Sequence, residues 1–178
     1  MKAVTQIFEW MDKLGIPQDY ASTRSLQLVS ECRDLISMGT DVFGREQLGH
    51  AETKKAWDAM KTAAYQDGVE LDLVSAFRSI DYQASLIERK LVAGQTIEEI
   101  LSVSAAPGFS EHHSGRALDI TTPQTSPLES DFSETTAYRW LMENAHHFEF
   151  SESYGPNNPH GLIWEPWHWC HQRCLIFA

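Results

Sequence analysis

The order in which helical and strand-like patterns follow one another is the feature that most constrains the fold of this chain. Apolar residues recur at helical spacing over 7–14 and 51–65, and they alternate over 69–76. Further helices are predicted at 81–91, 97–101 and 134–146, and further strands at 115–121, 148–151 and 162–169. Helices lead and the later strands have hairpin-like connections, so the pattern predicts an α+β fold with a small antiparallel sheet flanked by helices.

Length and charge limit the classes of protein to which the chain can belong. Its 178 residues are the usual size of one domain, and no internal repeat or linker divides them. Lys and Arg number 14 against 25 Asp and Glu, which gives a net charge of -11, and no basic run is present. We therefore expect no nucleic acid partner, because such binding needs clustered cations. No apolar stretch is long enough to predict a membrane span.

The amino terminus and the cysteines indicate a compartment. Glu9 and Asp12 interrupt the apolar residues of the first segment, so that segment does not have the pattern of a secretory signal. The sequence as written predicts a cytoplasmic protein, whereas a periplasmic or cell-wall location fits if a signal has been removed. An odd number of cysteines favours reduced thiols over a disulfide framework. These cysteines are Cys32, Cys170 and Cys174.

Two short stretches concentrate side chains that can bind a metal ion. One holds His112 and Asp119, and the other holds His168. If Asp119 lies in a strand and His112 in the loop before it, Gly115 allows the backbone to bend so that both side chains meet. Two imidazoles and one carboxylate, with a fourth position left open, are typical of a catalytic zinc site. We therefore expect one zinc ion on the sheet.

Glu165 precedes His168 by three residues and is the candidate general base. A carboxylate beside the metal can take a proton from the attacking water and pass it to a leaving amine, which is the chemistry of metal-assisted amide hydrolysis. Any one of these residues alone also fits an ordinary surface or turn position. His113 is the weaker ligand candidate, because in an extended chain it points away from the side on which His112 lies.

These motifs resemble those of a known family. Ser110, His112, Gly115, Ala117 and Asp119 fit the pattern Ser-x-His-x-x-Gly-x-Ala-x-Asp, and Glu165 with His168 fits Glu-x-x-His. The pattern resembles the zinc peptidases of the VanY-like D-alanyl-D-alanine carboxypeptidase group, whose relatives include VanX-type dipeptidases and phage L-alanyl-D-glutamate endopeptidases. A third block, Ser75-Ala76-Phe77-Arg78-Ser79 followed by Gln83, looks like the family's Ser-Gly-Tyr-Arg-Ser-x-x-x-Gln, with Ala76 and Phe77 as departures.

The resemblance implies a role for each matching residue. His112, Asp119 and His168 are implied as zinc ligands, and Glu165 as general base and acid. Arg78 is implied near the scissile carbonyl, where it can stabilise the oxyanion. Two further residues are implied to hold the backbone or terminal carboxylate of the substrate, namely Gln83 and Ser110. The family's last motif usually ends Arg-Tyr, which Cys170-His171 replaces here.

The length of the chain and the extent of the resemblance predict an organisation of the chain, and the resemblance implies a substrate. We expect a single zinc peptidase domain over 1–178, with a helical amino-terminal extension at 1–48 and a catalytic core at 49–172. The expected partner is a peptidoglycan stem peptide or the dipeptide D-Ala-D-Ala, and release of a terminal D-Ala is the expected reaction. A dipeptidase and an L-alanyl-D-glutamate endopeptidase stay open as alternatives. A non-catalytic module that binds peptidoglycan peptides is an alternative of a different class, against which the presence of Glu165 argues.

Overall fold

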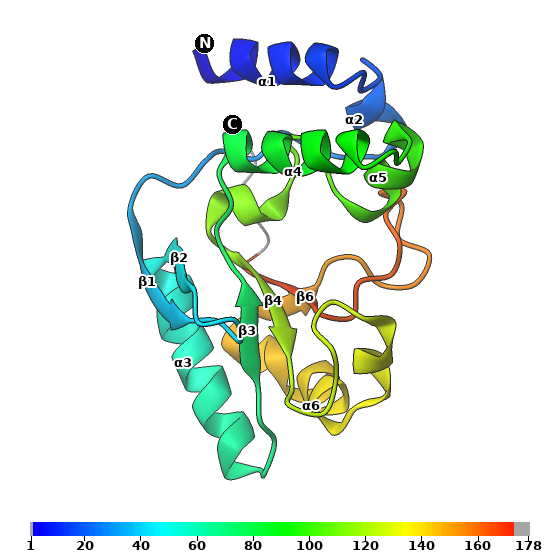
Figure 1. Ribbon diagram of the computed structural model, residues 1–178. Coiled ribbons are helices and arrows are strands. Elements are labelled where there is room, and N and C mark those ends of the chain that lie inside the picture. Colours follow the sequence, from blue (N-terminus) through cyan, green and yellow to red (C-terminus); the bar gives the residue numbers. More distant parts are fainter. Residues whose placement is uncertain (1, 173–178) are drawn as a thin grey trace.

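A four-stranded antiparallel sheet forms the centre of the structure, a computed structural model that describes residues 2–172 (Figure 1). Its strands lie in the order β3 (Asp72–Ser75), β4 (Ala117–Thr121), β6 (His168–His171) and β5 (Phe150–Glu152). Every residue of β4 and β6 is buried. The two central strands therefore offer a rigid, water-poor base for side chains that project from them.

Helices cover the sheet and build a second core beside it. The helices are α1 (Lys2–Lys13), α2 (Tyr20–Thr23), α3 (Ala51–Gln66), α4 (Ile80–Val92), α5 (Ile97–Val103) and α6 (Thr136–Asn144), with 3-10 turns η1 (Glu111–Ser114), η2 (Ser130–Glu134) and η3 (Ala145–Phe148). One core joins the sheet to α3 and α6, with Trp57, Leu118 and Leu141 among its residues. The other joins α1, α4 and α5, and in Figure 1 α1 and α4 lie side by side above the sheet.

The predicted fold class is confirmed, and the helices predicted at 81–91, 97–101 and 134–146 correspond to α4, α5 and α6. Local signals in the sequence set where two of them begin. The Ser79 side chain accepts a hydrogen bond from the Tyr82 amide at the start of α4, and Thr96 and Glu99 form a capping box at the start of α5. These caps satisfy amides that the first turn of a helix leaves without partners.

The expectation that residues 1–48 form a helical extension is wrong for its second half. The antiparallel strands β1 (Leu35–Thr40) and β2 (Glu46–His50) form a separate two-stranded sheet. The hairpin is held by long-range contacts that local periodicity does not show: the Phe77 amide donates to Leu48 O at 2.9 Å. The boundary of the catalytic core at residue 49 stays a prediction.

The predicted strand at 162–169 is also wrong over most of its length. Strand β6 begins only at His168, because Pro166 and Trp167 form a turn in which the His168 amide donates to Glu165 O at 2.9 Å. Proline has no amide hydrogen to give to a sheet. The preceding segment instead contacts α5, where the Ile163 amide donates to Ser102 O at 2.8 Å.

Over residues 2–172, the structure contains no helix long and apolar enough to cross a membrane. Cys170 is buried in β6, and Cys32 is partly exposed. Cys174, the third cysteine, lies outside the described residues.

Candidate active site

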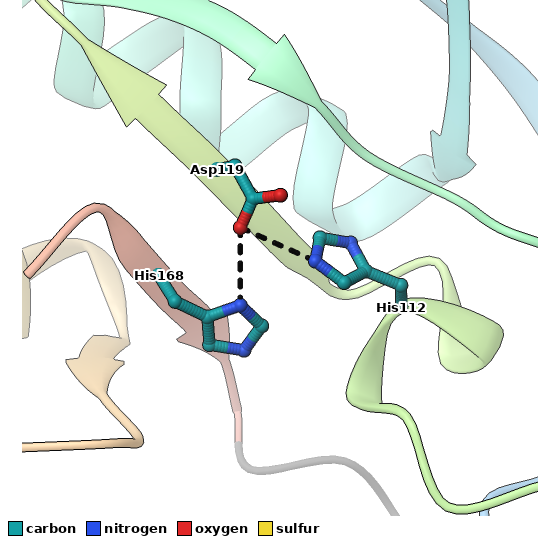
Figure 2. Close-up of side chains that lie close together, drawn as sticks. All are labelled: His112, Asp119 and His168. Atoms are coloured by element: carbon teal, nitrogen blue, oxygen red, sulfur yellow. Dashed lines mark hydrogen bonds and ion pairs between the residues drawn. The ribbon is translucent and has the colours of Figure 1, made fainter. Parts of the chain in front are cut away.

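The three predicted metal ligands meet at the centre of the sheet (Figure 2). His112 lies in η1, Asp119 in β4 and His168 at the start of β6. Gly115 makes the bend between the first two, with a φ of +67° and its carbonyl oxygen 2.9 Å from the His50 amide, which donates to it. A Cβ at Gly115 would lie 2.9 Å from that amide nitrogen, so the close approach requires glycine.

The distances within this group fit one metal ion. Asp119 lies directly opposite His168 in the pairing of β4 with β6. Oδ1 of Asp119 is 3.1 Å from Nδ1 of His168 and 3.2 Å from Nε2 of His112. Two ligands on a tetrahedral zinc ion with bonds of about 2.0–2.1 Å lie about 3.3 Å apart. Two imidazoles and one carboxylate, all buried, are the donor set of a catalytic and not of a structural zinc site.

Hydrogen bonds orient both imidazole rings toward this point. Nδ1 of His112 donates to Ala76 O at 2.5 Å, which leaves Nε2 facing Asp119. Nε2 of His168 donates to Oε2 of Glu111 at 2.9 Å, which leaves Nδ1 facing Asp119. When a histidine binds a metal through one ring nitrogen, a hydrogen-bond partner of the other nitrogen sets the orientation of the ring. Glu111 is thus a candidate functional residue that the sequence reasoning missed, although it lies inside the first motif.

The two histidines differ in protonation. Burial, with the nearby Arg78 charge, lowers the pKa of His112 to about 4, so its imidazole is neutral near pH 7. Burial also disfavours charge on His168, but hydrogen bonds to Asp119 and Glu111 outweigh it and raise the pKa of His168 to about 10. Metal binding at this group must therefore displace a proton from His168.

Glu165 lies beside the group, in the turn that precedes β6. Its amide donates to Tyr154 O at 3.0 Å, and Oε2 is 3.9 Å from Nδ1 of His168. The Glu165 side chain is only 12% exposed. Burial raises the pKa of Glu165 to about 7, against the opposing effect of His168 and with a further rise from the charge of Asp119. A carboxyl with a pKa near neutrality can both accept and donate a proton.

Arg78 reaches the same group from the loop that follows β3. Nε donates to the Ser75 hydroxyl at 3.0 Å, and Nη2 donates to Oδ2 of Asp119. Its backbone amide donates to His112 O at 3.2 Å, which ties this loop to η1. Within residues 2–172, Nη1 has no hydrogen-bond partner, so one end of the guanidinium is available to a ligand.

These side chains line one cleft of about 790 Å³, which also contains Gln83 and Ser110. Nε2 of Gln83 donates to Ala105 O at 2.8 Å. Its Oε1 is buried and has no hydrogen-bond partner among the described residues. A buried acceptor without a hydrogen bond costs free energy, and a ligand N–H group that reached Oε1 of Gln83 would remove this cost. Ser110 is buried directly before η1.

His113 has a different environment from His112, in agreement with the expectation that His113 is the weaker ligand candidate. It is fully buried, Nδ1 donates to Arg78 O at 2.7 Å, and Nε2 accepts from the Gly108 amide at 3.0 Å. Burial lowers the pKa of His113 to about 4, which agrees with a neutral ring that donates at one nitrogen and accepts at the other. His113 thus joins two loops of the site and is not part of the metal-ligand group.

The arrangement is that of a hydrolytic centre in a cleft, and comparison with known families agrees. The family model of VanY, D-alanyl-D-alanine carboxypeptidase, matches residues 46–173. The chain therefore belongs to the VanY family of D-alanyl-D-alanine carboxypeptidases, which are peptidases.

Two curated relatives have similar sequences. A protein of Bacillus subtilis named as a candidate carboxypeptidase, YodJ, is 34% identical over 122 residues, which is 65% of this chain and 44% of YodJ. A D-alanyl-D-alanine carboxypeptidase of Enterococcus faecalis is 32% identical over 117 residues, which is 60% of this chain and 42% of the relative. The chain spans less than half the length of these curated relatives.

Solved structures share the fold. The LdcB LD-carboxypeptidase has a TM-score of 0.73 at 26% identity, with 82% of this chain and 76% of that chain covered. VanYB in complex with D-alanine-D-alanine has a TM-score of 0.62 at 26% identity, with 81% and 84% covered. A VanY mutant in complex with Zn(II) has a TM-score of 0.62 at 24% identity, with 82% of this chain and 86% of that chain covered. This match shows a similar fold.

Proposed function

We propose that this protein is a zinc-dependent carboxypeptidase that releases a terminal D-Ala from a peptidoglycan stem peptide. The observation that carries the proposal is that one cleft holds the group of His112, Asp119 and His168 together with Glu165 and Arg78. Family membership supports the reaction class. The complex of VanYB with D-alanine-D-alanine supports the substrate class.

In this proposal the ligands of one Zn²⁺ ion are His112 Nε2, Asp119 Oδ1 and His168 Nδ1. Their donor chemistry and their separations of 3.1 and 3.2 Å fit the ion, and a related fold has been solved with Zn(II). When bound, zinc supplies Lewis-acid polarisation of a carbonyl and lowers the pKa of a coordinated water.

Glu165 serves as the general base and then as the general acid. Its carboxylate takes the proton of the attacking water and gives it to the leaving amine nitrogen, which departs as a neutral amine. The pKa of about 7 and the low exposure suit both steps, since the carboxyl is neither fully ionised nor fully protonated near neutral pH.

Arg78 and Gln83 position the peptide. The available Nη1 of Arg78 donates to the carbonyl oxygen as negative charge develops there. Oε1 of Gln83 accepts a backbone N–H of the substrate, because its amide nitrogen is already used by Ala105. Ser110, which lines the same cleft, offers a hydroxyl to the substrate backbone.

Release of D-Ala from an L,D-bond is the second candidate, because the LD-carboxypeptidase LdcB matches with a TM-score of 0.73. A D-Ala-D-Ala dipeptidase and an L-alanyl-D-glutamate endopeptidase use the same chemistry on other bonds. A binding module without turnover has no need of a buried carboxyl with a pKa near neutrality beside the metal ligands.

Mass spectrometry of the products tests the proposal. The zinc-loaded protein is incubated separately with D-Ala-D-Ala, a pentapeptide stem ending in D-Ala-D-Ala, and a tetrapeptide stem ending in one D-Ala. Loss of one D-Ala from the pentapeptide is the expected result, whereas loss from the tetrapeptide only would establish the L,D-activity. An internal cut would establish an endopeptidase, and intact peptides in all three reactions would overturn the peptidase proposal.

A further inference from the structure

We propose that Lys90 binds the terminal carboxylate of the substrate and thereby makes the enzyme select free chain ends. This inference rests on the proposed function and deepens it, since it names the group that the cleft recognises beyond the scissile bond. Sequence comparison with the family motifs does not point to Lys90, which lies outside all three of them.

The position of Lys90 on α4 places it along the wall of the cleft. Lys90 follows Gln83 by seven residues, which is close to two helical turns, so both side chains project from the same face about 10 Å apart along the axis. Both line the cleft, and Arg78 lies just before the start of the same helix. One face of α4 thus runs from the reacting end of the cleft to Lys90.

Lys90 differs from the other lysine and arginine side chains of the cleft in what it contacts. Arg45 forms an ion pair with Asp41, and Arg78 with Asp119. Nζ of Lys90 donates to the hydroxyl of Ser104 at 2.9 Å, and no carboxylate of residues 2–172 forms an ion pair with it. A partly buried ammonium whose partner is a neutral hydroxyl has donors left for an anion.

The electrostatic environment favours an anion at this point. Burial and the charge of Arg78 lower the pKa of Lys90, while the charge of Glu165 raises it. Lys90 therefore lies within electrostatic range of the residues on which the proposed reaction depends. A carboxylate that binds to Lys90 offsets both the burial and the repulsion by Arg78, and it forms a charge-assisted hydrogen bond.

The ligand that fits is the carboxylate at the end of a peptide. In a carboxypeptidase, this group lies one residue beyond the scissile bond, and this proposal places it along the cleft wall that α4 lines. Gln83 does not supply a charge, because it is neutral and its atom without a hydrogen-bond partner among the described residues is an acceptor. A cation binds a carboxylate more strongly than a neutral donor does, and Lys90 is the cleft cation without a carboxylate partner among the described residues.

Calorimetric binding to zinc-loaded protein tests this role without cleavage. All proteins carry Glu165→Gln, and the probes are a stem peptide ending in D-Ala-D-Ala as the free acid and the same peptide as its terminal amide. We expect Lys90→Met to weaken binding of the acid by about 10- to 100-fold and to leave binding of the amide unchanged, because a hydrogen bond between charged groups is lost only for the acid.

Two further variants separate charge recognition from other effects. Lys90→Arg keeps the charge and is expected to retain most of the preference for the acid. Lys55→Met removes the same charge from an exposed position on α3 and controls for the overall field of the protein. Each protein is compared for melting temperature and for zinc content by elemental analysis.

The outcomes for this inference and for the proposed function are distinct. The role of Lys90 would be overturned if the protein that keeps Lys90 bound the acid and the amide equally. It would also be overturned if Lys90→Met weakened binding of both peptides equally. In either case the peptidase proposal stands. If the zinc-loaded protein that keeps Lys90 bound neither peptide, both the role of Lys90 and the peptidase proposal would be overturned. Loss confined to the acid supports the inference.

Discussion

Nε2 of His168 donates a hydrogen bond to Oε2 of Glu111 across 2.9 Å, and Nδ1 of the same ring faces Asp119 at 3.1 Å. The two contacts use both nitrogens of one imidazole and so determine which nitrogen a metal can reach. Because Glu111 precedes His112 directly, one turn supplies both a candidate ligand and the residue that orients another ligand. This arrangement suggests that the affinity for metal depends on a carboxylate that does not touch the ion.

Glu111→Gln is therefore expected to weaken zinc binding by about 10- to 100-fold, which is the usual effect of removing such a partner. Competition with a chromogenic chelator measures the dissociation constant directly. Glu143→Gln, an exposed change on α6, is the matched control. An unchanged affinity in the Glu111 variant would show that His168 is held by other contacts.

His112→Ala is expected to abolish stoichiometric zinc binding, because it removes one of three donors that lie within 4.8 Å of one another. Elemental analysis of the folded protein after dialysis against zinc provides the measurement. A variant that keeps one zinc ion per chain would remove His112 from the ligand set.

His113→Ala, in contrast to His112→Ala, is expected to retain one zinc ion but to lower the stability of the fold. The change removes hydrogen bonds to Arg78 O and from the Gly108 amide in a buried place, so the free energy of unfolding is expected to fall by about 2–4 kcal/mol. Urea denaturation measures this difference. Loss of zinc at undiminished stability would contradict the assignment.

Glu165→Gln is expected to preserve zinc content and fold but to lower kcat by about 10²- to 10⁴-fold, since the amide keeps the shape and cannot exchange the proton. The assay follows release of D-Ala from the peptide that the unchanged protein cleaves. Activity within a factor of two or three of the original would exclude the general-base role.

Asp41→Asn tests the pH dependence of stability away from the metal. Burial by itself raises the pKa of Asp41, but hydrogen bonds from Arg45, Phe43 and Gln47 together lower it below its ordinary value. The ionised carboxylate therefore stabilises the fold above the unfolded pKa of about 3.9, and this contribution is lost as the pH falls through the lower folded pKa.

The expected difference in unfolding free energy between the two proteins is about 1–2 kcal/mol at pH 7, and it should shrink toward zero in acid. Denaturation at a series of pH values between 7 and 3 measures it. A difference that stays constant over this range would mean that the charge of Asp41 has no part in the stabilisation.

Local sequence determined the types and order of most elements and the chemistry of the site. Local sequence patterns predicted α4 and α5, and the caps at Ser79 and Thr96 that the structure shows likewise depend on residues within one or two turns. The spacing of His112, Gly115 and Asp119 predicted a bend that brings the first two ligands together, because that bend depends on one glycine with a positive φ. Pro166 lies in the predicted last strand and was the available sign that β6 begins later.

Tertiary structure alone decided which side chains meet across the chain and which atom each presents. The pairing of β4 with β6 places Asp119 opposite His168, 49 residues away, and periodicity within either strand does not specify that register. The hairpin of β1 and β2 and the orientation of His113 depend in the same way on contacts with distant loops. So does the exposure of Lys90 to the cleft beside Ser104, because burial and hydrogen bonding are set by neighbours that only the folded chain brings together.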